Sequence, residues 1–321
     1  MAAAVSPDRI LRQLSELWTA EGGQSDAGVL RACSMTLIVV AEASDDASAL
    51  GETLAALMPE HPARAILVRL SGEGERALTE RVYQQCWMPF GQRRQICCEQ
   101  IEITASDAAL ADLPSVLLPL AVPDLPVILW CRSARLAARP DLRDLSLIAT
   151  KVIFDTFGAL NPADDVSRLA GAPRSGLLLA DLAWTRLTRW RESLARLFEN
   201  REYLGRLSEI ESVRVCFPPG AETSAWYLAA WAGLALGLTP GVSRGGKSLR
   251  LELSAPGFEV SLVRENGRLV TTAGGQSSCA SLPEPSDYLL MREELAIVRP
   301  DPVFERTLAS AARLAVSFSS G

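Results

Sequence analysis

A continuous, largely apolar run at Met35–Ala41 (MTLIVVA) constrains the fold of this chain more than any other feature. Such a run is typical of a strand that is buried on both faces of a sheet. Ser44-Asp45-Asp46 then offers a helix cap and an acidic first turn for a helix over Ala47–Met58. A second apolar strand follows at Arg64–Leu70. Strand, helix and strand in immediate succession predict a βαβ unit whose two strands are parallel.

The remaining elements of the first half extend this unit into a larger sheet. Leu78–Met88 and Arg94–Ile103 predict a strand pair around the turn Pro89-Phe90-Gly91. Further helices are predicted at Ser6–Thr19 and Ala105–Leu113, further strands at Leu125–Trp130 and Lys151–Phe154, and an Arg/Asp-rich surface segment at Ser133–Asp144. We therefore expect residues 1–170 to form an α/β domain, a mixed sheet covered by helices.

Gly171, Pro173 and Gly176 mark the expected boundary with a second, α+β domain over residues 171–321. In three segments of this domain, Leu249–Leu253, Phe258–Val263 and Arg268–Thr272, apolar and polar residues alternate with a period of two residues. Glu265-Asn266-Gly267 supplies a hairpin turn between the last two segments. The predicted helices are Leu182–Leu197, Ala221–Leu238, Asp287–Ile297 and Asp301–Val316, and the predicted strands are Ser212–Phe217, Leu249–Leu253, Phe258–Val263 and Arg268–Thr272. The fold class is thus α/β in the broad sense, with mixed α+β character.

Composition excludes several classes of partner. A net charge of −6 argues against a chain-wide nucleic-acid footprint. The apolar stretch Leu113–Cys131 holds four prolines, which break a spanning helix, and Ala225–Leu238 is shorter than the ~20 residues that a span needs. The first residues lack the basic and apolar regions of a secretory signal. We therefore expect a cytoplasmic protein that binds neither nucleic acid nor membrane.

Histidine and cysteine usage limits the chemistry. His61 is the only histidine, which leaves little room for Ser-His-Asp triads or His-rich zinc sites. The seven cysteines include no CxxC pair, so the pattern fits neither a disulfide framework nor a zinc site. We expect buried, reduced thiols. Composition and motifs alone indicate an α/β protein that is not a hydrolase, and they predict no catalytic residue, no metal and no cofactor.

One segment imitates a nucleotide-binding motif. Gly241–Ser248 (GVSRGGKS) matches the pattern G-x-x-x-x-G-K-[ST]. A P-loop follows a strand and opens a helix, whereas this segment follows a predicted helix and leads into a predicted strand. The context favours a Gly-rich connection between helix and strand over a phosphate site.

Trp184, Arg186, Trp190 and Arg191 are candidate contact residues, because Trp and Arg are enriched at protein–protein hot spots. Arg186 and Trp190 are four residues apart, so a Trp/Arg stack on one helix is feasible. Arg191 lies two turns beyond Trp184 on the same side. The alternative is that both tryptophans face the core while the arginines are solvated.

Other candidates lie in the first half. His61 and Arg64 stand where a helix leads into a strand, and they could hold a phosphate or an acidic partner. The alternative is a histidine that interacts with the last helical carbonyls. Asp124, Glu99 and Asp155 are the carboxylates that stand isolated within apolar runs. Asp124 lies between two prolines, where a turn role is favoured over catalysis.

Five blocks resemble a known family. HPARAI (61–66), CCEQIEI (97–103), LPSVLLPLAVPDLPVILWCR (113–132), DLAWTRLTRWRESLARLF (181–198) and REELAIVRPDPVFERTL (292–308) are similar, in order, to the bacterial glucose-6-phosphate dehydrogenase assembly protein OpcA. The resemblance implies a non-catalytic assembly factor and allosteric activator. Such a factor binds glucose-6-phosphate dehydrogenase and favours its active oligomer, at the entry to the oxidative pentose phosphate pathway. The family blocks imply these partner-binding residues: His61, Arg64, Asp124, Trp130, Arg132, Trp184, Arg186, Trp190 and Arg191.

Two other functions stay open on the sequence. One is a sugar-phosphate- or nucleotide-binding enzyme or sensor that uses Gly241–Ser248 or His61 and Arg64. The other is a purely structural oligomer. In photosynthetic members of the family, thiol redox is thought to tune the effect, but the adjacent Cys97-Cys98 pair is poorly suited to forming a relaxed disulfide.

Overall fold

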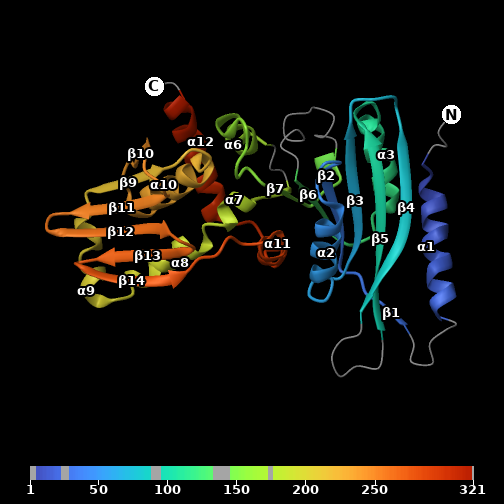
Figure 1. The fold of residues 1–321 in the computed structure, drawn as a ribbon, viewed down its shortest axis with the longest axis horizontal. Helices are drawn as coiled ribbons and strands as arrows, with labels where there is room; N and C mark the ends of the chain where they lie inside the picture. The colour runs from blue at the N-terminus through green and yellow to red at the C-terminus, as the bar shows by residue number, and fades with distance from the viewer. Residues whose placement is uncertain (1–4, 23–28, 88–94, 133–144, 173–175, 320–321) are drawn as a thin grey trace. The chain divides into compact units, whose positions relative to one another are not determined.

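The computed structural model describes residues 5–22, 29–87, 95–132, 145–172 and 176–319 (Figure 1). The chain divides into two compact units that alternate along the sequence. Unit 1 comprises Met1–Phe154, Arg174–Ala180 and Asp287–Val298, and unit 2 comprises Asp155–Pro173, Asp181–Ser286 and Arg299–Gly321. Each unit contains helices and a β-sheet, so the α/β class with mixed α+β character is confirmed.

The sheet of unit 1 has eight strands. Seven of them follow the order β1 (Val29–Arg31), β5 (Gln95–Ser106), β3 (Ala63–Gly72), β2 (Met35–Glu42), β6 (Val127–Cys131), β7 (Lys151–Phe154) and β8 (Leu178–Asp181). The eighth, β4 (Leu78–Trp87), pairs with β5 in antiparallel fashion. The pairs β1–β5, β5–β3, β3–β2, β2–β6 and β6–β7 are parallel. The sheet is therefore mixed.

The βαβ prediction is confirmed. β2 is parallel to β3 with Met35 opposite Ala63, and all residues of β2 except the last are buried. The intervening helix α2 (Ala47–Leu57) begins at Asp46, whose carboxylate accepts hydrogen bonds from the amides of Ser48 and Ala49. The predicted pairing of the next two strands is also confirmed by β4 and β5. Their turn at 89–91 and the surface segment 133–144 lie outside the described residues.

Helices of unit 1 share a core with the sheet. α1 (Pro7–Gly22) packs against β4 and α3 (Leu113–Leu120), and α2 packs against α11 (Asp287–Leu295). Ile10 and Leu14 of α1 join sheet residues such as Ile38 and Ile66 in one apolar cluster. A 3-10 turn, η1 (Asp107–Asp112), joins β5 to α3. The helix predicted at 105–113 begins later than expected, at Asp107, because β5 extends to Ser106. It also continues further, through α3 to Leu120.

The sheet of unit 2 has six strands in the order β10 (Gly241–Arg244), β9 (Ser212–Phe217), β11 (Arg250–Ala255), β12 (Phe258–Glu265), β13 (Arg268–Ala273) and β14 (Gln276–Ser281). β10 is parallel to β9, and the other pairs are antiparallel. Asn266 and Gly267 form the predicted hairpin turn, with φ of 48° and 71°. Both values lie in the left-handed region that a two-residue turn of this type requires.

The helices of unit 2 are α6 (Pro162–Ala170), α7 (Leu182–Thr185), α8 (Thr188–Leu197), α9 (Arg201–Leu204), α10 (Glu222–Leu236) and α12 (Pro302–Ser319), with a 3-10 turn η2 (Leu207–Glu209). α10 packs against α12 and β9. Two predictions need correction. The single helix expected at 182–197 is two helices separated by a turn at Arg186 and Leu187, and the first half of Gly241–Ser248 is a strand rather than a loop. That strand forms because its backbone pairs with β9, a contact distant in sequence.

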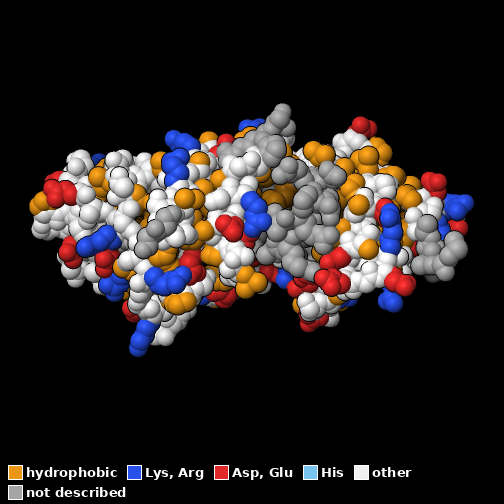
Figure 2. Space-filling model, turned by 90° about the horizontal axis from the view of Figure 1, so that it is seen from above, with side chains coloured by type: hydrophobic (Ala, Val, Ile, Leu, Met, Phe, Trp, Pro, Cys, Tyr) orange, Lys and Arg blue, Asp and Glu red, His pale blue; other side chains and the backbone are white. Residues whose placement is uncertain are grey.

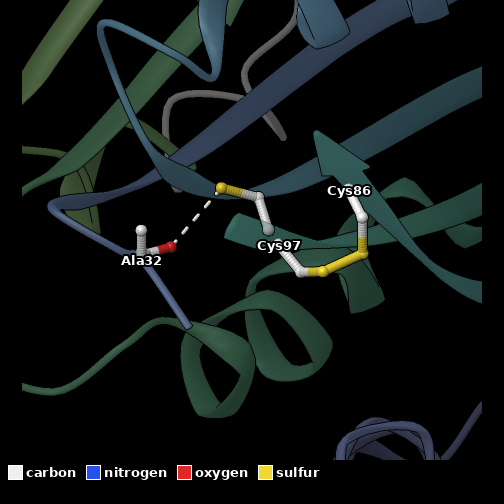
Figure 3. Close-up of a disulfide and its surroundings, with 4 residues drawn as sticks. Ala32, Cys86 and Cys97 are labelled. Atoms are coloured by element: carbon white, nitrogen blue, oxygen red, sulfur yellow. Dashed lines mark hydrogen bonds between the residues drawn. A yellow bond between two sulfur atoms is a disulfide. The ribbon is translucent and has the colours of Figure 1, made fainter. Parts of the chain in front are cut away.

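The expectation that every cysteine is a reduced thiol is wrong for one pair. Cys86 and Cys97 face each other across β4 and β5 and form a disulfide (Figure 3). Cys98, next to the bridge, donates instead to the carbonyl of Ala32. Burial raises the pKa of Cys98 to about 11 and that of Cys131 to about 12, so both thiols stay protonated at neutral pH.

Within the described ranges, no helix is long and apolar enough to cross a membrane. The proline-rich stretch that imitates a span divides into α3, a turn and β6. On the face seen in Figure 2, basic and acidic side chains are interspersed rather than gathered by sign.

Candidate partner-binding site

Asp181 organises the part of unit 2 that holds the Trp/Arg candidates. It stands directly before α7, and its carboxylate caps that helix by accepting from the amide of Ala183 at 2.9 Å. The same carboxylate accepts from the amide of Thr156 at 3.1 Å and from its hydroxyl at 2.5 Å. Tyr227 of α10 donates its phenol hydroxyl at 2.8 Å. One buried carboxylate thus joins α7, α10 and the segment after β7.

None of these donors carries a charge, and this determines the acidity of Asp181. Burial raises the pKa of Asp181 to about 6, and the nearby charge of Asp155 adds to the rise, while hydrogen bonds from Thr156 oppose it. Burial also raises the pKa of Tyr227 well above its ordinary value. The phenol therefore remains a hydrogen-bond donor throughout the pH range in which Asp181 titrates.

Arg186, immediately after α7, is fixed in a bidentate ion pair with Asp155. Its two terminal nitrogens lie 2.8 and 2.9 Å from the two carboxylate oxygens. Its guanidinium also lies over the ring of Phe157, 4.8 Å from the centroid. The Phe157 amide donates to Asp155 at 3.1 Å. A planar guanidinium held by a fork of two hydrogen bonds and an aromatic face has little conformational entropy left to lose on binding.

Beside this ion pair, the segment between β7 and α6 exposes two large apolar side chains. Phe157 is 41% exposed and Leu160 is 94% exposed. Together with Arg186, whose side chain is only 14% exposed, they form what we call the Arg186 surface, defined by Phe157, Leu160 and Arg186. Aromatic residues and arginine are enriched where proteins bind one another, and Leu160 adds exposed apolar area to them.

The two tryptophans of this region are buried. Trp184 packs its ring against Tyr227 and Phe304, each with a centroid separation of 6.0 Å, and Trp190 is 3% exposed. Arg191 lies over the Trp184 ring at 3.5 Å. The stack that forms is therefore Arg191 on Trp184, and Arg186 lies on Phe157 instead of Trp190. The turn between α7 and α8 breaks the spacing from which the other stack was predicted.

In unit 1 the structure brings Trp130 and Arg132 together. Trp130 is fully buried in β6, and the Arg132 guanidinium lies 5.2 Å from its ring centroid. Arg132 also forms an ion pair with Asp287 at the start of α11, and its Nε lies 3.9 Å from Asp45. Arg132 thus joins the end of β6 to α11.

His61 and Arg64 face different surroundings. Arg64 is buried, and its Nε donates to Glu99 at 2.5 Å while a terminal nitrogen donates to the Leu120 carbonyl at 2.7 Å. His61 is half-buried, and its backbone amide donates to the carbonyl of Leu57 at 2.8 Å. The Arg64 side chain is thus committed to the interior.

Asp124 is exposed and has a φ of 62°, a left-handed conformation that asparagine and aspartate tolerate better than most residues. It therefore occupies the turn between α3 and β6, which accords with a turn role.

The P-loop-like segment has the order strand, loop and strand. β10 covers Gly241–Arg244, and the remaining residues lead directly into β11. A P-loop needs a helix N-terminus at this point to hold phosphate. No group of three or more His, Cys, Asp or Glu side chains within the described part of the chain is placed to hold a metal ion.

Sequence reasoning missed Thr156, Phe157, Leu160 and Tyr227. Phe157 and Leu160 follow a strand in a segment that no periodic pattern marks, and Tyr227 lies in a helix that is apolar on every side. A signal existed for the acids. Asp155 stands isolated after an apolar strand, and Asp181 precedes a helical pattern, where a capping acid is expected.

The described fold is that of a mixed α/β protein with a separate sheet in each of two units. Two sequence-family models match the amino-acid sequence of this chain. One is described as the glucose-6-phosphate dehydrogenase subunit N-terminal domain and matches residues 55–171; the other is described as the C-terminal domain of the same subunit and matches residues 178–308. Together they cover more than half of the chain, which belongs to this family, OpcA.

Curated relatives carry the same family name. A protein of Synechocystis sp. named as a candidate OxPP cycle protein OpcA is 27% identical over 198 residues, which cover 61% of this chain and 41% of the relative. Its namesake from Nostoc punctiforme is 29% identical over 136 residues, which cover 42% of this chain and 29% of the relative. The alignments thus span less than half the length of these relatives.

Among solved structures, biliverdin reductase from Synechocystis sp. matches with a TM-score of 0.48 and 9% identity, over 89% of this chain and 98% of that one. An oxidoreductase from Sinorhizobium meliloti matches with a TM-score of 0.49 and 10% identity, over 89% and 97%. At these values neither structure defines the fold or the chemistry of this chain.

Proposed function

We propose that this chain is a non-catalytic subunit that binds glucose-6-phosphate dehydrogenase and favours the active oligomer of that enzyme. Its place is then the oxidative pentose phosphate pathway. The observation that carries the proposal is the pair of family models, both described as parts of a glucose-6-phosphate dehydrogenase subunit, at residues 55–171 and 178–308.

We place a principal contact at the Arg186 surface. Arg186 is one of the residues that the family resemblance implies. Its guanidinium lies over the partly exposed ring of Phe157, and Leu160, three residues further along the chain, is almost fully exposed. The Asp155 fork and the buried Asp181 cluster hold this segment from beneath. His61, Asp124 and Arg132 remain predicted contacts in unit 1. The buried residues Trp184, Trp190, Trp130 and Arg64 would act by supporting the residues over them.

Activation requires a difference in affinity. A subunit that bound the active and inactive states of the dehydrogenase equally would change nothing, however tightly it bound. A tenfold preference for the active state corresponds to about 1.4 kcal/mol of coupling free energy. The subunit therefore has to contact a part of the dehydrogenase that differs between its states.

The test measures binding and rate together. The purified chain is mixed with the dehydrogenase from the same source, the complex is followed by sedimentation velocity, and kcat and KM are measured with and without the chain. We expect a complex and a change in kcat or KM. The absence of both a complex and a kinetic change would contradict the proposal.

Two exposed leucines make a matched pair for locating the contact. Leu160→Asp puts a charge into the Arg186 surface, whereas Leu147→Asp makes the same change at a residue of unit 1 that is 78% exposed. We expect the first to weaken binding at least tenfold and the second to leave it unchanged. For the guanidinium, Arg186→Ala is compared with Arg189→Ala, whose side chain is 69% exposed.

A ligand-binding enzyme or sensor is the competing function. Thermal-shift measurements with glucose 6-phosphate, NADPH and ATP on the isolated chain separate it from the proposed subunit. Stabilisation that is lost in Lys247→Ala would favour nucleotide or sugar-phosphate binding at Gly241–Ser248.

A further inference from the structure

Strand β14 is one of the two outer strands of the six-stranded sheet in unit 2 (Figure 1). All six of its residues, Gln276–Ser281, are exposed. None of them is charged and none is proline. Natural sheets normally protect such an edge with charges, proline, a bulge or a short strand, because the free backbone groups are a template for another strand.

The direction of the free backbone groups follows from one hydrogen bond. The Leu282 amide donates to the Gly267 carbonyl at 2.7 Å, so the backbone of Leu282 faces β13. The direction of the backbone amide and carbonyl alternates from residue to residue along an antiparallel ladder. The amides and carbonyls of Gln276, Ser278 and Ala280 therefore also face β13. The amides and carbonyls that face away from the sheet belong to Ser277, Cys279 and Ser281.

Two other outer strands differ from β14. β10 has four residues, begins directly after Pro240, and carries Arg244 at its end, paired with Glu222 at 2.8 Å. β4 carries Glu80 and Arg81, and α1 packs against it. Both therefore carry the usual protection against pairing with another strand, and β14 does not.

We propose that β14 pairs with β14 of a second copy of this chain, antiparallel and about a twofold axis at Cys279. Cys279 then faces Cys279 of the second copy, and Ser277 faces Ser281 on either side. The three outward amides of each copy meet the three outward carbonyls of the other, because their positions are symmetric about Cys279. An uncharged strand can meet its own copy without repulsion between like charges. Pro283 lies at the next outward position and ends the pairing.

The first test uses a proline that removes an outward donor and no inward one. The full chain, Cys279→Pro and Cys279→Ser are compared by sedimentation equilibrium over a concentration series. We expect the chain and Cys279→Ser to dimerise and Cys279→Pro to remain a monomer. Urea denaturation checks the fold of Cys279→Pro, which we expect to hold because residue 279 makes no ladder hydrogen bond to β13. A wild-type monomer at every concentration, or a dimer that survives in folded Cys279→Pro, would overturn the proposal.

The second test addresses the register. Ser277→Lys combined with Ser281→Lys places like charges opposite each other in the dimer, whereas Ser277→Lys combined with Ser281→Glu places opposite charges there. Two cross-strand pairs change in each case, so we expect the dissociation constants of the two double variants to differ by about tenfold or more. A short bis-maleimide should also link two copies through Cys279, and should fail with Cys279→Ser. Equal dissociation constants for the two double variants would contradict the twofold register.

Discussion

Two buried carboxylates, Glu99 in unit 1 and Asp181 in unit 2, are satisfied in opposite ways. Glu99 accepts from the Arg64 guanidinium at 2.5 Å and from the Trp18 indole at 2.7 Å, so a full counter-charge is buried with it. Asp181 accepts only from amides and hydroxyls among its described partners. The comparison teaches that a buried acid with a counter-ion is sensitive to loss of its partner, whereas one held by neutral donors is sensitive to pH.

Removing the counter-ion should have the largest effect. Arg64→Ala leaves the Glu99 carboxylate buried without its ionic partner, and we expect a loss of about 4 kcal/mol in the free energy of unfolding. Urea denaturation measures it. Arg64→Met combined with Glu99→Leu removes both charges and should recover most of the loss. If the double variant were as unstable as the single one, the account of this pair would be wrong.

We expect the second-largest effect for Asp181→Ala, a loss of about 3 kcal/mol in the free energy of unfolding, because the substitution leaves buried hydroxyl and amide donors without an acceptor. Asp181→Asn is the matched control. Its amide oxygen accepts from the two backbone amides and its nitrogen donates to the two hydroxyls, so we expect it to cost less than about 1 kcal/mol. Equal losses for the two variants would show that these hydrogen bonds are not the source of the stability.

The pH dependence of stability should report the raised pKa of Asp181. The folded pKa of Asp181, about 6, lies above its ordinary value of 3.8, so the folded state binds the proton more tightly. This stabilisation is complete below the unfolded pKa and is lost as pH rises through about 6. Relative to Asp181→Asn, the chain should gain about 1 kcal/mol between pH 7 and pH 5. A difference between the two proteins that stays constant with pH would contradict the raised pKa.

The smallest effect on stability is expected at the surface. Leu160→Asp changes a side chain that is 94% exposed, so the free energy of unfolding should stay within about 0.5 kcal/mol of the parent chain. A larger loss would mean that the 157–160 segment packs more tightly than its exposure indicates. The same measurement on Leu147→Asp, a change at a residue that is 78% exposed, should also show no loss, and the binding of the two variants can then be compared directly.

Much of the fold could be predicted from local pattern. The βαβ unit, the β4–β5 pair and the Asn266-Gly267 hairpin follow from apolar periodicity, a capping acid and turn chemistry, which are properties of a few adjacent residues. β10 depends instead on pairing with β9, a strand distant in sequence. The Cys86–Cys97 bridge depends on the register of the β4–β5 pair, which the strand pattern did not fix.

The candidate site was predicted only in part for the same reason. Arg186 was identified by residue type, but its aromatic partner is Phe157, which lies far away in the sequence. The turn after α7 also changes the spacing on which the Trp190 stack depended. Residue type therefore identified the arginines, while their neighbours required the structure.

The most direct test of the central claim is the activity of glucose-6-phosphate dehydrogenase titrated with this chain, with complex formation followed in the same samples. We predict saturable binding, a change in kcat or KM that saturates with it, and loss of both in Leu160→Asp but not in Leu147→Asp. A dehydrogenase whose oligomeric state and rate are the same at every concentration of the chain would contradict the account.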